Sequence, residues 1–313
     1  MRLIRRLVPP CLSGPGLVAT IGSYDGLHLG HRALLERVHV QAAERGLQTM
    51  MVTFEPLPRE FFAPENPPAR LTTFRERWRL LEDTMLDVFC VLHFSHSLRQ
   101  LGGADFARQL AAAGVRSLVI GHDFRAGRGG EATAEWLQAA GPGFGFDVEV
   151  LEPVLQGGVR VSSRGVREAL GCGDLDGARR LLGRGYSMVG RVIRGEQLGR
   201  KLGFPTANLR LSRRRTPTDG IFAVRVHGVV GADAQPHGLP GVASLGTRPT
   251  VNGTVPLLEA HVFDFDGDLY GREIEVQFIA RLRDELRFDT LDAMVQQMHR
   301  DAAAARAVLR EVD

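Results

Sequence analysis

The stretch LVATIGSYDGLHLGHRALLERV (residues 17–38) decides the fold, because a strand pattern gives way to a helix pattern within it. Residues 17–21 are apolar or β-branched, as in a buried strand, and Gly22 interrupts them. The apolar spacing after the turn predicts an amphipathic helix over 30–45, and a second strand follows over 47–54. We therefore expect a βαβ unit.

The rest of the N-terminal half repeats this alternation of strand and helix patterns. Further strand patterns cover residues 86–94, 115–121 and 146–154, and helical patterns cover 74–84, 103–113 and 131–140. Alternating strands and helices predict a parallel sheet with helices on both faces. Such sheets bind ligands at the carboxyl ends of their strands, where the turn after the first strand is expected to lie.

The pattern changes in the C-terminal half. A helix is predicted around 163–182, and from Tyr186 onward short strand patterns are divided by Gly, Pro and Asp turn signals. Only the C-terminal segment returns to helical spacing. These features predict an antiparallel barrel closed by a terminal helix, with the boundary near 183–186. We expect an α/β domain over 1–184 and an all-β domain over 185–313.

The composition is that of a folded globular protein. Hydrophobic residues make up 44% of the 313 residues and charged residues 24%, which argues against long disordered tails. The length favours two domains or one large domain with extensions. The formal net charge of +3 comes mostly from arginines spread along the chain, which favours anionic small molecules and gives no sign of a nucleic-acid surface.

Cysteine spacing and the lack of a long apolar run bear on where the protein works. Cys11, Cys90 and Cys172 are widely separated and show no metal-binding spacing, so neither a disulfide framework nor a zinc site is expected. No apolar run approaches the roughly 18 residues that a membrane-spanning helix needs. The sequence therefore predicts a cytoplasmic protein without a membrane partner.

Two histidines lie in the turn that opens the first helix. Gly22 and Gly26 permit a tight turn, and the helix start offers N–H groups that favour an anion. In that place His28 and His31 can hold phosphate oxygens and stabilise the charge on a leaving diphosphate. The alternative is that both are ordinary polar residues at a helix start, and the spacing alone does not decide.

The motifs of this half resemble a known family. GSYDGLHLGH (22–31) resembles the HxGH signature of the nucleotidyltransferase superfamily. Four further segments follow in family order: TFEPLPREFF (53–62), RLTTFRERWRLL (70–81), IGHDFRAG (120–127) and VSSRGVREAL (161–170), the last matching the form SSTxxR. Together they are similar to the bacterial bifunctional riboflavin kinase/FMN adenylyltransferases, often called FAD synthetases.

The resemblance implies roles for residues of the N-terminal half. His28 and His31 would act in catalysis by contacting the ATP phosphates. The implied ATP site also includes Gly22, Gly30, Ser162, Ser163 and Arg167. The residues implied around the flavin and adenine are Phe54, Pro56, Asp123 and Arg125. The phosphate of FMN would attack the α-phosphorus of ATP with release of pyrophosphate, a reaction that needs positioning and charge stabilisation more than a base.

Several positions depart from the family pattern. The substituted residues of the N-terminal half are Ser23, Tyr24, Leu57, Ala126 and Arg164. Arg164 stands where SSTxxR has threonine, and its guanidinium either pairs with phosphate or blocks the site. An alternative hypothesis is therefore a riboflavin kinase whose N-terminal domain has lost its chemistry.

The run GRVIRGEQLGRKLGFPTANLRL (190–211) dominates the C-terminal half, and it contains no Walker-type phosphate loop. Thr206 and Asn208 are two residues apart, so on a strand their oxygens share one face, as Mg²⁺ ligands would. A turn with a capping hydroxyl is the alternative from the residues alone. GFPTAN resembles the riboflavin kinase signature, which implies that Thr206 and Asn208 bind Mg·ATP, with Lys201 in the ATP site.

Later segments extend the resemblance. GVASLGTRPTVNG (241–253), with Ser244 in place of Asn, and LLEAHVFDFDGDLYGREI (257–274) resemble family segments. By this resemblance Glu259 is the base that deprotonates the 5′-hydroxyl of riboflavin; a surface glutamate without a role is the plain alternative. ARLRDELRFDTLDAM (280–294) resembles the segment that closes over flavin, which implies ring contacts from Arg283, Glu285 and Phe288.

The resemblance spans nearly the whole chain and implies a bifunctional enzyme of flavin cofactor synthesis. The expected architecture is a Rossmann-like nucleotidyltransferase domain followed by a barrel of riboflavin kinase type with a terminal helix. The expected partners are riboflavin, FMN and ATP, with ATP as co-substrate and Mg²⁺ as cofactor. A basic nucleic-acid-binding protein is the competing class, which dispersed arginines and few aromatic residues on a basic face argue against.

Overall fold

The computed structural model describes residues 1–7, 14–195, 199, 202–229, 237–250 and 253–311. The chain divides into two compact units, each described by itself. Unit 1 comprises Met1–Pro68 and Arg77–Ser162, and unit 2 comprises Ala69–Glu76 and Ser163–Asp313. Among the described residues, no helix combines the length and the apolar character needed to cross a membrane.

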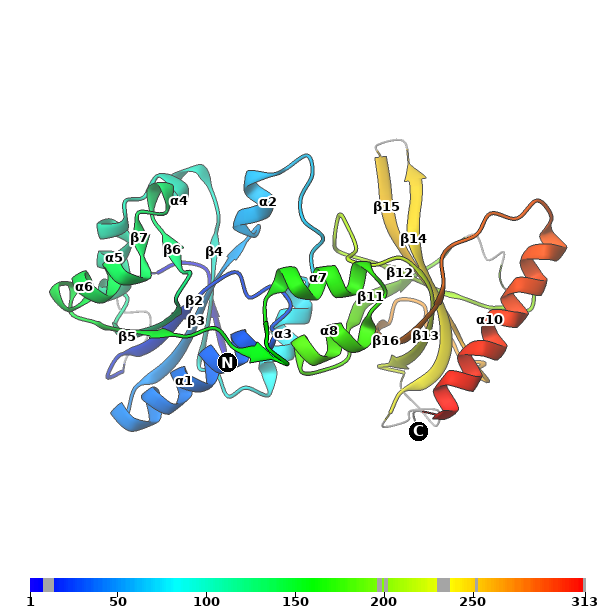
Figure 1. Ribbon diagram of the computed structural model, residues 1–313, viewed down its shortest axis with the longest axis horizontal. Helices are drawn as coiled ribbons and strands as arrows, with labels where there is room; N and C mark the ends of the chain where they lie inside the picture. Colours follow the sequence, from blue (N-terminus) through cyan, green and yellow to red (C-terminus); the bar gives the residue numbers. More distant parts are fainter. Residues whose placement is uncertain (8–13, 196–198, 200–201, 230–236, 251–252, 312–313) are drawn as a thin grey trace. The chain divides into compact units, whose positions relative to one another are not determined.

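Unit 1 is built on a six-stranded parallel sheet (Figure 1). Its strands are β1 (Arg2–Ile4), β2 (Leu17–Ile21), β3 (Gln48–Glu55), β4 (Val88–His93), β5 (Val115–Gly121) and β8 (Asp147–Leu151). They lie in the order β1-β4-β3-β2-β5-β8, and every neighbouring pair is parallel. The predicted parallel sheet is confirmed, while the short edge strand β1 was not predicted.

Helices cover both faces of this sheet because alternate strand residues point to opposite sides. Val18 packs with Val38 and Ala42 of α1 (Leu29–Arg45) on one face. The neighbouring residues of β2 pack on the other face with α5 (Gly103–Ala112) and α6 (Ala134–Phe144). The remaining short elements are α2 (Pro58–Phe62), α3 (Phe74–Glu82), α4 (His96–Gln100), β6 (Arg125–Ala126), η1 (Arg128–Gly130), β7 (Ala132–Thr133), β9 (Leu155–Gln156) and β10 (Val159–Arg160).

Unit 2 contains a closed antiparallel barrel, as predicted (Figure 1). Its strands are β11 (Ser187–Ile193), β12 (Ala207–Arg210), β13 (Gly220–His227), β14 (Leu239–Thr250), β15 (Gly253–Val262) and β16 (Glu273–Arg283). They close in the order β11-β12-β15-β14-β13-β16. Leu209, Leu245, Leu258 and Phe222 belong to one large, fully buried apolar cluster.

The C-terminal helix α10 (Leu291–Glu311) covers part of the barrel's outer face. Ala305 and Leu309 of this helix pack against Ala223 and Phe263, which are strand residues or their immediate neighbours. The helix therefore supplies the second layer that an apolar outer strand face needs. The predicted terminal helix is confirmed.

The compact units part at residue 162, earlier than the predicted domain boundary near 184. In place of one helix there are two, α7 (Ser163–Gly171) and α8 (Leu175–Leu182), because Gly173 takes a positive φ of 76° and Asp174 caps the second helix. Their apolar residues join the same buried cluster as the barrel. The functional domains 1–184 and 185–313 stay a prediction.

A short segment from the N-terminal half also belongs to unit 2. Both carboxylate oxygens of Glu76 accept hydrogen bonds from Arg213 Nη2, at 2.5 and 2.6 Å, and Oε1 also accepts from Val189 N at 2.7 Å. Oε2 accepts from Thr73 N at 2.7 Å, while Arg213 Nη1 donates to Tyr186 Oη at 3.0 Å. The side chains of Glu76 and Arg213 are only 5% and 0% exposed, so the ion pair is buried, and hydrogen bonds engage both carboxylate oxygens.

Candidate active sites

The turn between β2 and α1 gives the two histidines of unit 1 different tasks. His28 is the N-cap of α1, and its Nδ1 accepts a hydrogen bond from His31 N at 3.3 Å. The two rings stack with their centroids 3.6 Å apart. His28 is thus a helix-capping residue, and a neutral His28 keeps its proton on Nε2, where it can donate to an anion. The two interpretations of the histidine pair are therefore compatible.

Two glycines, Gly30 and Gly22, leave space for the rings of His28 and Tyr24. A Cβ at Gly30 would lie 3.2 Å from the His28 ring and 3.7 Å from the carbonyl oxygen of Val161, which precedes Ser162. A Cβ at Gly22 would lie 3.2 Å from the ring of Tyr24. Gly30 therefore lets the chain pass close to both the histidine and the segment that carries the serine.

His31 is held in its neutral form. Burial lowers the pKa of His31 well below its usual value, and repulsion from the Arg77 charge, and from His28 when that ring is protonated, lowers it further. Within the part of the chain that the structure describes, its buried Nδ1 has no hydrogen-bond partner. A neutral imidazole whose ring nitrogen lacks a partner can donate a hydrogen bond to a ligand or accept one from it, according to its tautomer.

Arg77 supports this turn and was not singled out from the sequence. It is fully buried, and its Nη1 donates to Ser23 O at 2.9 Å and to Thr53 Oγ1 at 3.2 Å. Its Nη2 donates to Glu55 Oε2 at 2.8 Å. An arginine at a core position of an amphipathic helical pattern was the signal that could have found it.

The other predicted residues of unit 1 come from the ends of adjacent strands. Phe54 lies in β3 with Phe94 edge-on at 5.6 Å, and Pro56 follows that strand after a cis peptide bond. Asp123 and Arg125 follow β5. Because β2 lies between β3 and β5, these residues and the histidine turn all lie at the carboxyl edge of three neighbouring strands.

The predicted SSTxxR element is divided between the two units. Ser162 ends unit 1, whereas Ser163 and Arg167 belong to unit 2, where both lie in α7. Arg167 Nε donates to Ala69 O at 2.6 Å, and its Nη1 donates to Ser163 O at 3.1 Å. Arg167 therefore fixes the segment that leads to Glu76, a task the sequence did not suggest.

In unit 2, strand pairing brings the predicted kinase residues into one row. Asn208 lies opposite Glu259, and Glu259 lies opposite Ser244. Ser244 lies opposite Ile221, which is followed on the next strand by Arg283. Directly paired residues of an antiparallel sheet point to the same face, so these five side chains cross five strands side by side.

All five residues of this row line a cavity of about 540 Å³, called the large cavity below. Other lining residues come from the segment after β16 and from α10, namely Glu285, Leu286, Arg287, Phe288, Met294, Met298 and Asp301. The volume and the mixed apolar and polar lining are typical of a small-molecule site. The predicted residues Arg283, Glu285 and Phe288 are thus brought together with Glu259.

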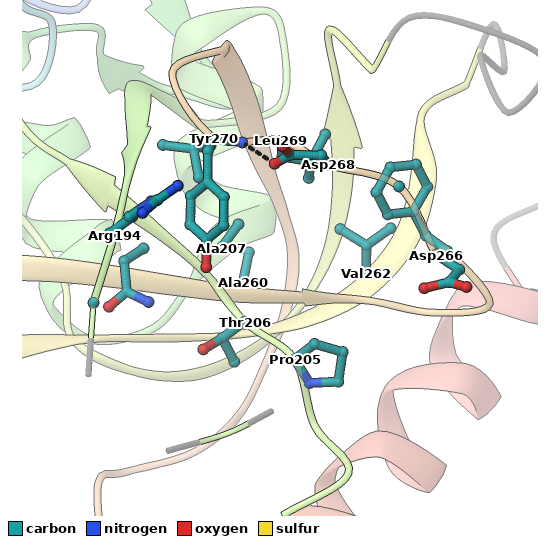
Figure 2. A pocket seen from close by; sticks show the side chains of 15 residues that line it. Arg194, Pro205, Thr206, Ala207, Ala260, Val262, Asp266, Asp268, Leu269 and Tyr270 are labelled. Atoms are coloured by element: carbon teal, nitrogen blue, oxygen red, sulfur yellow. Dashed lines mark hydrogen bonds between the residues drawn. The ribbon is translucent and has the colours of Figure 1, made fainter. Parts of the chain in front are cut away.

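A second cavity of about 440 Å³, called the small cavity, shares Thr206 and Asn208 with the large one. Figure 2 shows its labelled side chains, among them Arg194, Asp266 and Tyr270. The Arg194 guanidinium lies 5.4 Å from the centre of the Tyr270 ring. Thr206 and Asn208 therefore stand where two cavities meet, while Lys201 lies outside the described residues.

Comparison with known proteins agrees with this arrangement. Residues 13–165 match the FAD synthetase family model, and residues 182–309 match the riboflavin kinase model. Curated bifunctional riboflavin kinase/FMN adenylyltransferases from Pseudomonas fluorescens and Escherichia coli (strain K12) are each 43% identical. The first match covers 98% of both chains, and the second covers 93% of this chain and 92% of the relative.

The chain belongs to the bifunctional riboflavin kinase/FMN adenylyltransferase family. The family predicted from the motifs is confirmed, and the match to both models favours the bifunctional enzyme over the kinase-only alternative. A crystal structure titled as a macrolide-efflux protein from Streptococcus pneumoniae has a TM-score of 0.80 and 28% identity, and covers 97% of this chain and 98% of its own.

The structure shows the surroundings of four of the residues that depart from the family pattern. The extra hydroxyl of Tyr24 lies 2.5 Å from Thr20 Oγ1, and Leu57 is a buried residue at the N-cap of α2. Ala126 pairs with Ala132 in a two-stranded ribbon. Arg164 Nε binds Glu168 on an exposed helix face at 2.7 Å, so the carboxylate already engages this guanidinium.

Residues of α10 are the part of the large cavity that sequence reasoning missed. Met294, Met298 and Asp301 line the large cavity. His261 was missed as well; its Nδ1 donates to Pro205 O at 2.8 Å and so fixes the backbone beside Thr206. The signal for Asp301 was an acidic residue on the apolar stripe of an amphipathic helix.

Gly195 offers a test of how Asn208 is held. A Cβ at this position would lie 2.8 Å from three atoms of the Asn208 amide group, so alanine must displace the amide. Gly195→Ala is expected to slow FMN formation about tenfold, because small misplacements of a positioning group are costly. Gly171→Ala is the matched control, since its Cβ would meet only Pro217 O at 3.8 Å. Equal kinase rates for the two variants, measured with saturating substrates, contradict the assignment.

Proposed function

We propose that unit 2 transfers the γ-phosphoryl group of ATP to the 5′-hydroxyl of riboflavin, giving FMN and ADP. The single observation that carries this proposal is that Thr206 and Asn208 line both cavities, with Glu259 directly opposite Asn208. A nucleotide in the small cavity and a flavin in the large cavity would meet at this point. Phosphoryl transfer depends mainly on such positioning of donor and acceptor.

Glu259 is proposed as the general base of the kinase reaction. Its carboxylate takes the proton of the 5′-hydroxyl as the oxygen attacks the γ-phosphorus, and the bond to the bridging oxygen of ADP breaks. Glu259 is half-buried on β15 and lines the large cavity, where the flavin would bind. Asn208 and Ser244 flank it and keep the row polar at this point.

Magnesium fits the residues that the structure offers at the junction of the cavities. A hydroxyl oxygen from Thr206 and an amide oxygen from Asn208 are hard ligands, and a Mg²⁺ ion commonly takes one or two protein oxygens together with phosphates and waters. The ion would supply charge neutralisation on the phosphates of ATP. Thr206 and Asn208 would orient these phosphates toward the large cavity.

The second proposed activity is the adenylylation of FMN to FAD in the N-terminal domain. The phosphate of FMN attacks the α-phosphorus of ATP, and pyrophosphate leaves. The histidine turn at the carboxyl edge of β2 supports this proposal: His28 caps α1, the neutral His31 ring stacks on it, and both would donate hydrogen bonds to phosphate oxygens. Phe54, Pro56, Asp123 and Arg125 would surround the flavin and adenine, and Ser162 would bind the triphosphate. Ser163 and Arg167 belong to unit 2, so their role in binding the triphosphate stays a prediction from the resemblance.

A single assay tests both activities. Purified protein with riboflavin, ATP and Mg²⁺ is expected to form FMN and then FAD, separated by chromatography. His28→Asn keeps a side chain that caps helices well but removes the imidazole, so α1 stays capped. FAD formation from FMN is expected to fall tenfold to a hundredfold, in line with roughly 1.5–3 kcal/mol for a hydrogen bond to a charged group. An unchanged FAD rate in this variant, with FMN formation intact, contradicts the role of the turn.

The use of ATP supports a cytoplasmic location. The exposed Cys172 is a free thiol, as expected in a reducing compartment. Fractionation of cells that express the chain at native level tests this, and recovery with the membranes contradicts it.

A further inference from the structure

Asp301 is a buried carboxylate in the wall of the large cavity. It lies in α10, on the same helix face as Met294 and Met298, and all three line the cavity. A carboxylate among apolar side chains is costly unless charged donors compensate for the lost water. Here the charged donor is Arg283, which belongs to the row of paired strand residues described above.

Arg283 provides that compensation through a bidentate ion pair. Its Nε donates to Asp301 Oδ1 at 2.9 Å and its Nη2 donates to Oδ2 at 2.6 Å. Gln297, one helical turn before Asp301, donates to Oδ1 at 2.9 Å. The two charged side chains are 9% and 20% exposed, so water screens the pair only weakly. The orientation of the Arg283 guanidinium is therefore set by α10.

The Arg283 end of the row lies far from the phosphoryl-transfer end. From Glu259 on β15 the row crosses β14 and β13 to reach β16, which is three strand spacings, or roughly 14 Å measured along the curved barrel wall and less in a straight line. This span suits a substrate whose reacting hydroxyl ends a five-carbon chain and whose other end is a tricyclic ring. A riboflavin with its 5′-hydroxyl at Glu259 thus brings its ring toward Arg283.

Arg283 has donors left for that ring. Among the described residues it uses Nε and Nη2 for Asp301, and Nη1 for Asp284 O at 2.7 Å. These bonds engage three of its five N–H groups. The remaining two suit the carbonyl oxygens of a flavin ring, provided that the planar guanidinium is fixed in orientation.

We propose that Asp301 is a positioning residue of the riboflavin site, which acts by orienting Arg283 toward the ring of the bound flavin. The inference rests on the proposed kinase activity of unit 2 and adds which residue determines riboflavin affinity. It separates two tasks along one row: Glu259 and Asn208 serve the transfer step, and the Arg283–Asp301 pair serves ring recognition. Loss of Asp301 should therefore change the KM for riboflavin far more than kcat.

The test is Asp301→Asn, which keeps the size of the side chain and removes its charge. The KM for riboflavin is expected to rise about tenfold, with kcat and the KM for ATP within about twofold of wild type. Binding of riboflavin without ATP, followed by quenching of flavin fluorescence, should weaken by the same factor. Because the binding measurement needs no turnover, it tests the inference even if the wild-type protein forms no FMN, a result that would reject only the proposed kinase activity.

Asp264→Asn is the matched control. Asp264 forms a second bidentate pair between α10 and the barrel, with Arg306 at 2.7 and 2.8 Å, and does not line the large cavity. Its φ of 54° suits asparagine, so the control should fold. An unchanged riboflavin KM in Asp301→Asn, or equal shifts in the two variants, overturns the inference. So does a loss of kcat with no change in riboflavin binding.

Gln297→Leu covers the case in which Asp301→Asn does not fold. It removes one donor to Asp301 Oδ1 and leaves both charges in place. A rise in riboflavin KM of about threefold, with ATP KM unchanged, supports the proposal. A KM equal to that of wild type in this folded variant overturns it.

Discussion

Glu259→Gln is expected to abolish FMN formation while conversion of FMN to FAD stays near the wild-type rate. The amide keeps the shape of the side chain but cannot accept the proton of the 5′-hydroxyl. Loss of a general base typically costs about 10²–10⁴ in rate. Glu259 lies beside Asn208 at the proposed transfer site. The defect should therefore appear in kcat, and both KM values should stay within a few fold of wild type. Product formation from riboflavin and from FMN is measured separately.

Glu275→Gln is the control for this variant. Glu275 also lies on a barrel strand, β16, and lines neither described cavity. Its kinase rate should match that of wild type. If Glu259→Gln silences both activities in a protein that remains folded, the assignment of the two reactions to separate sites is wrong. If it silences neither, Glu259 is not the base.

Glu76→Gln is expected to destabilise unit 2 by roughly 3–5 kcal/mol. The change removes the charge that balances Arg213, and breaking one side of a buried ion pair leaves the other charge uncompensated. Hydrogen exchange of the β11 amides reports on this unit directly, because Val189 N donates to Glu76. Exchange protection should fall by roughly two to three and a half orders of magnitude, which follows from 1.4 kcal/mol per factor of ten.

Two further variants compare the contribution of the buried Glu76–Arg213 pair to stability with that of an exposed ion pair. Glu168→Gln breaks the exposed pair with Arg164, whose side chains are 61% and 80% exposed, and should change stability by less than about 1 kcal/mol. Replacing both buried partners, as Glu76→Leu with Arg213→Met, should recover most of the loss, because an apolar pair leaves no unbalanced charge. Equal protection in Glu76→Gln and Glu168→Gln is the result that refutes a structural role for the buried pair.

The fold class was predictable because it depends on local periodicity. Apolar runs alternating with helical spacing indicated the parallel sheet, and short strand patterns with turn signals indicated the barrel. The spacing of Thr206 and Asn208 predicted that they share one strand face; Thr206 lies just before β12, yet both residues line the two cavities. That Glu259 lies opposite Asn208 depends on strand register, which is a property of the assembled barrel.

Other features could not be obtained from local patterns. Assignment of residues 69–76 to unit 2 depends on Arg213, which lies 137 positions after Glu76. The capping role of His28 depends on side-chain geometry at the turn, which the sequence spacing left open. The contributions of Arg77 and Asp301 were in principle visible as charges at core helix positions, but their partners lie on other elements.

That residues 69–76 belong to unit 2 affects the order in which a nascent chain acquires structure. The ribosome adds 137 residues between Glu76 and Arg213, which takes roughly 7–30 s at 5–20 residues per second. The last strand of the parallel sheet, β8, ends at Leu151, so that sheet can form first. During this interval the eight residues 69–76, which comprise a loop and the first turn of α3, stay exposed to water because the barrel they pack against has not been synthesised. Truncated messages that end before residue 213 should therefore yield chains in which this loop is open to proteases.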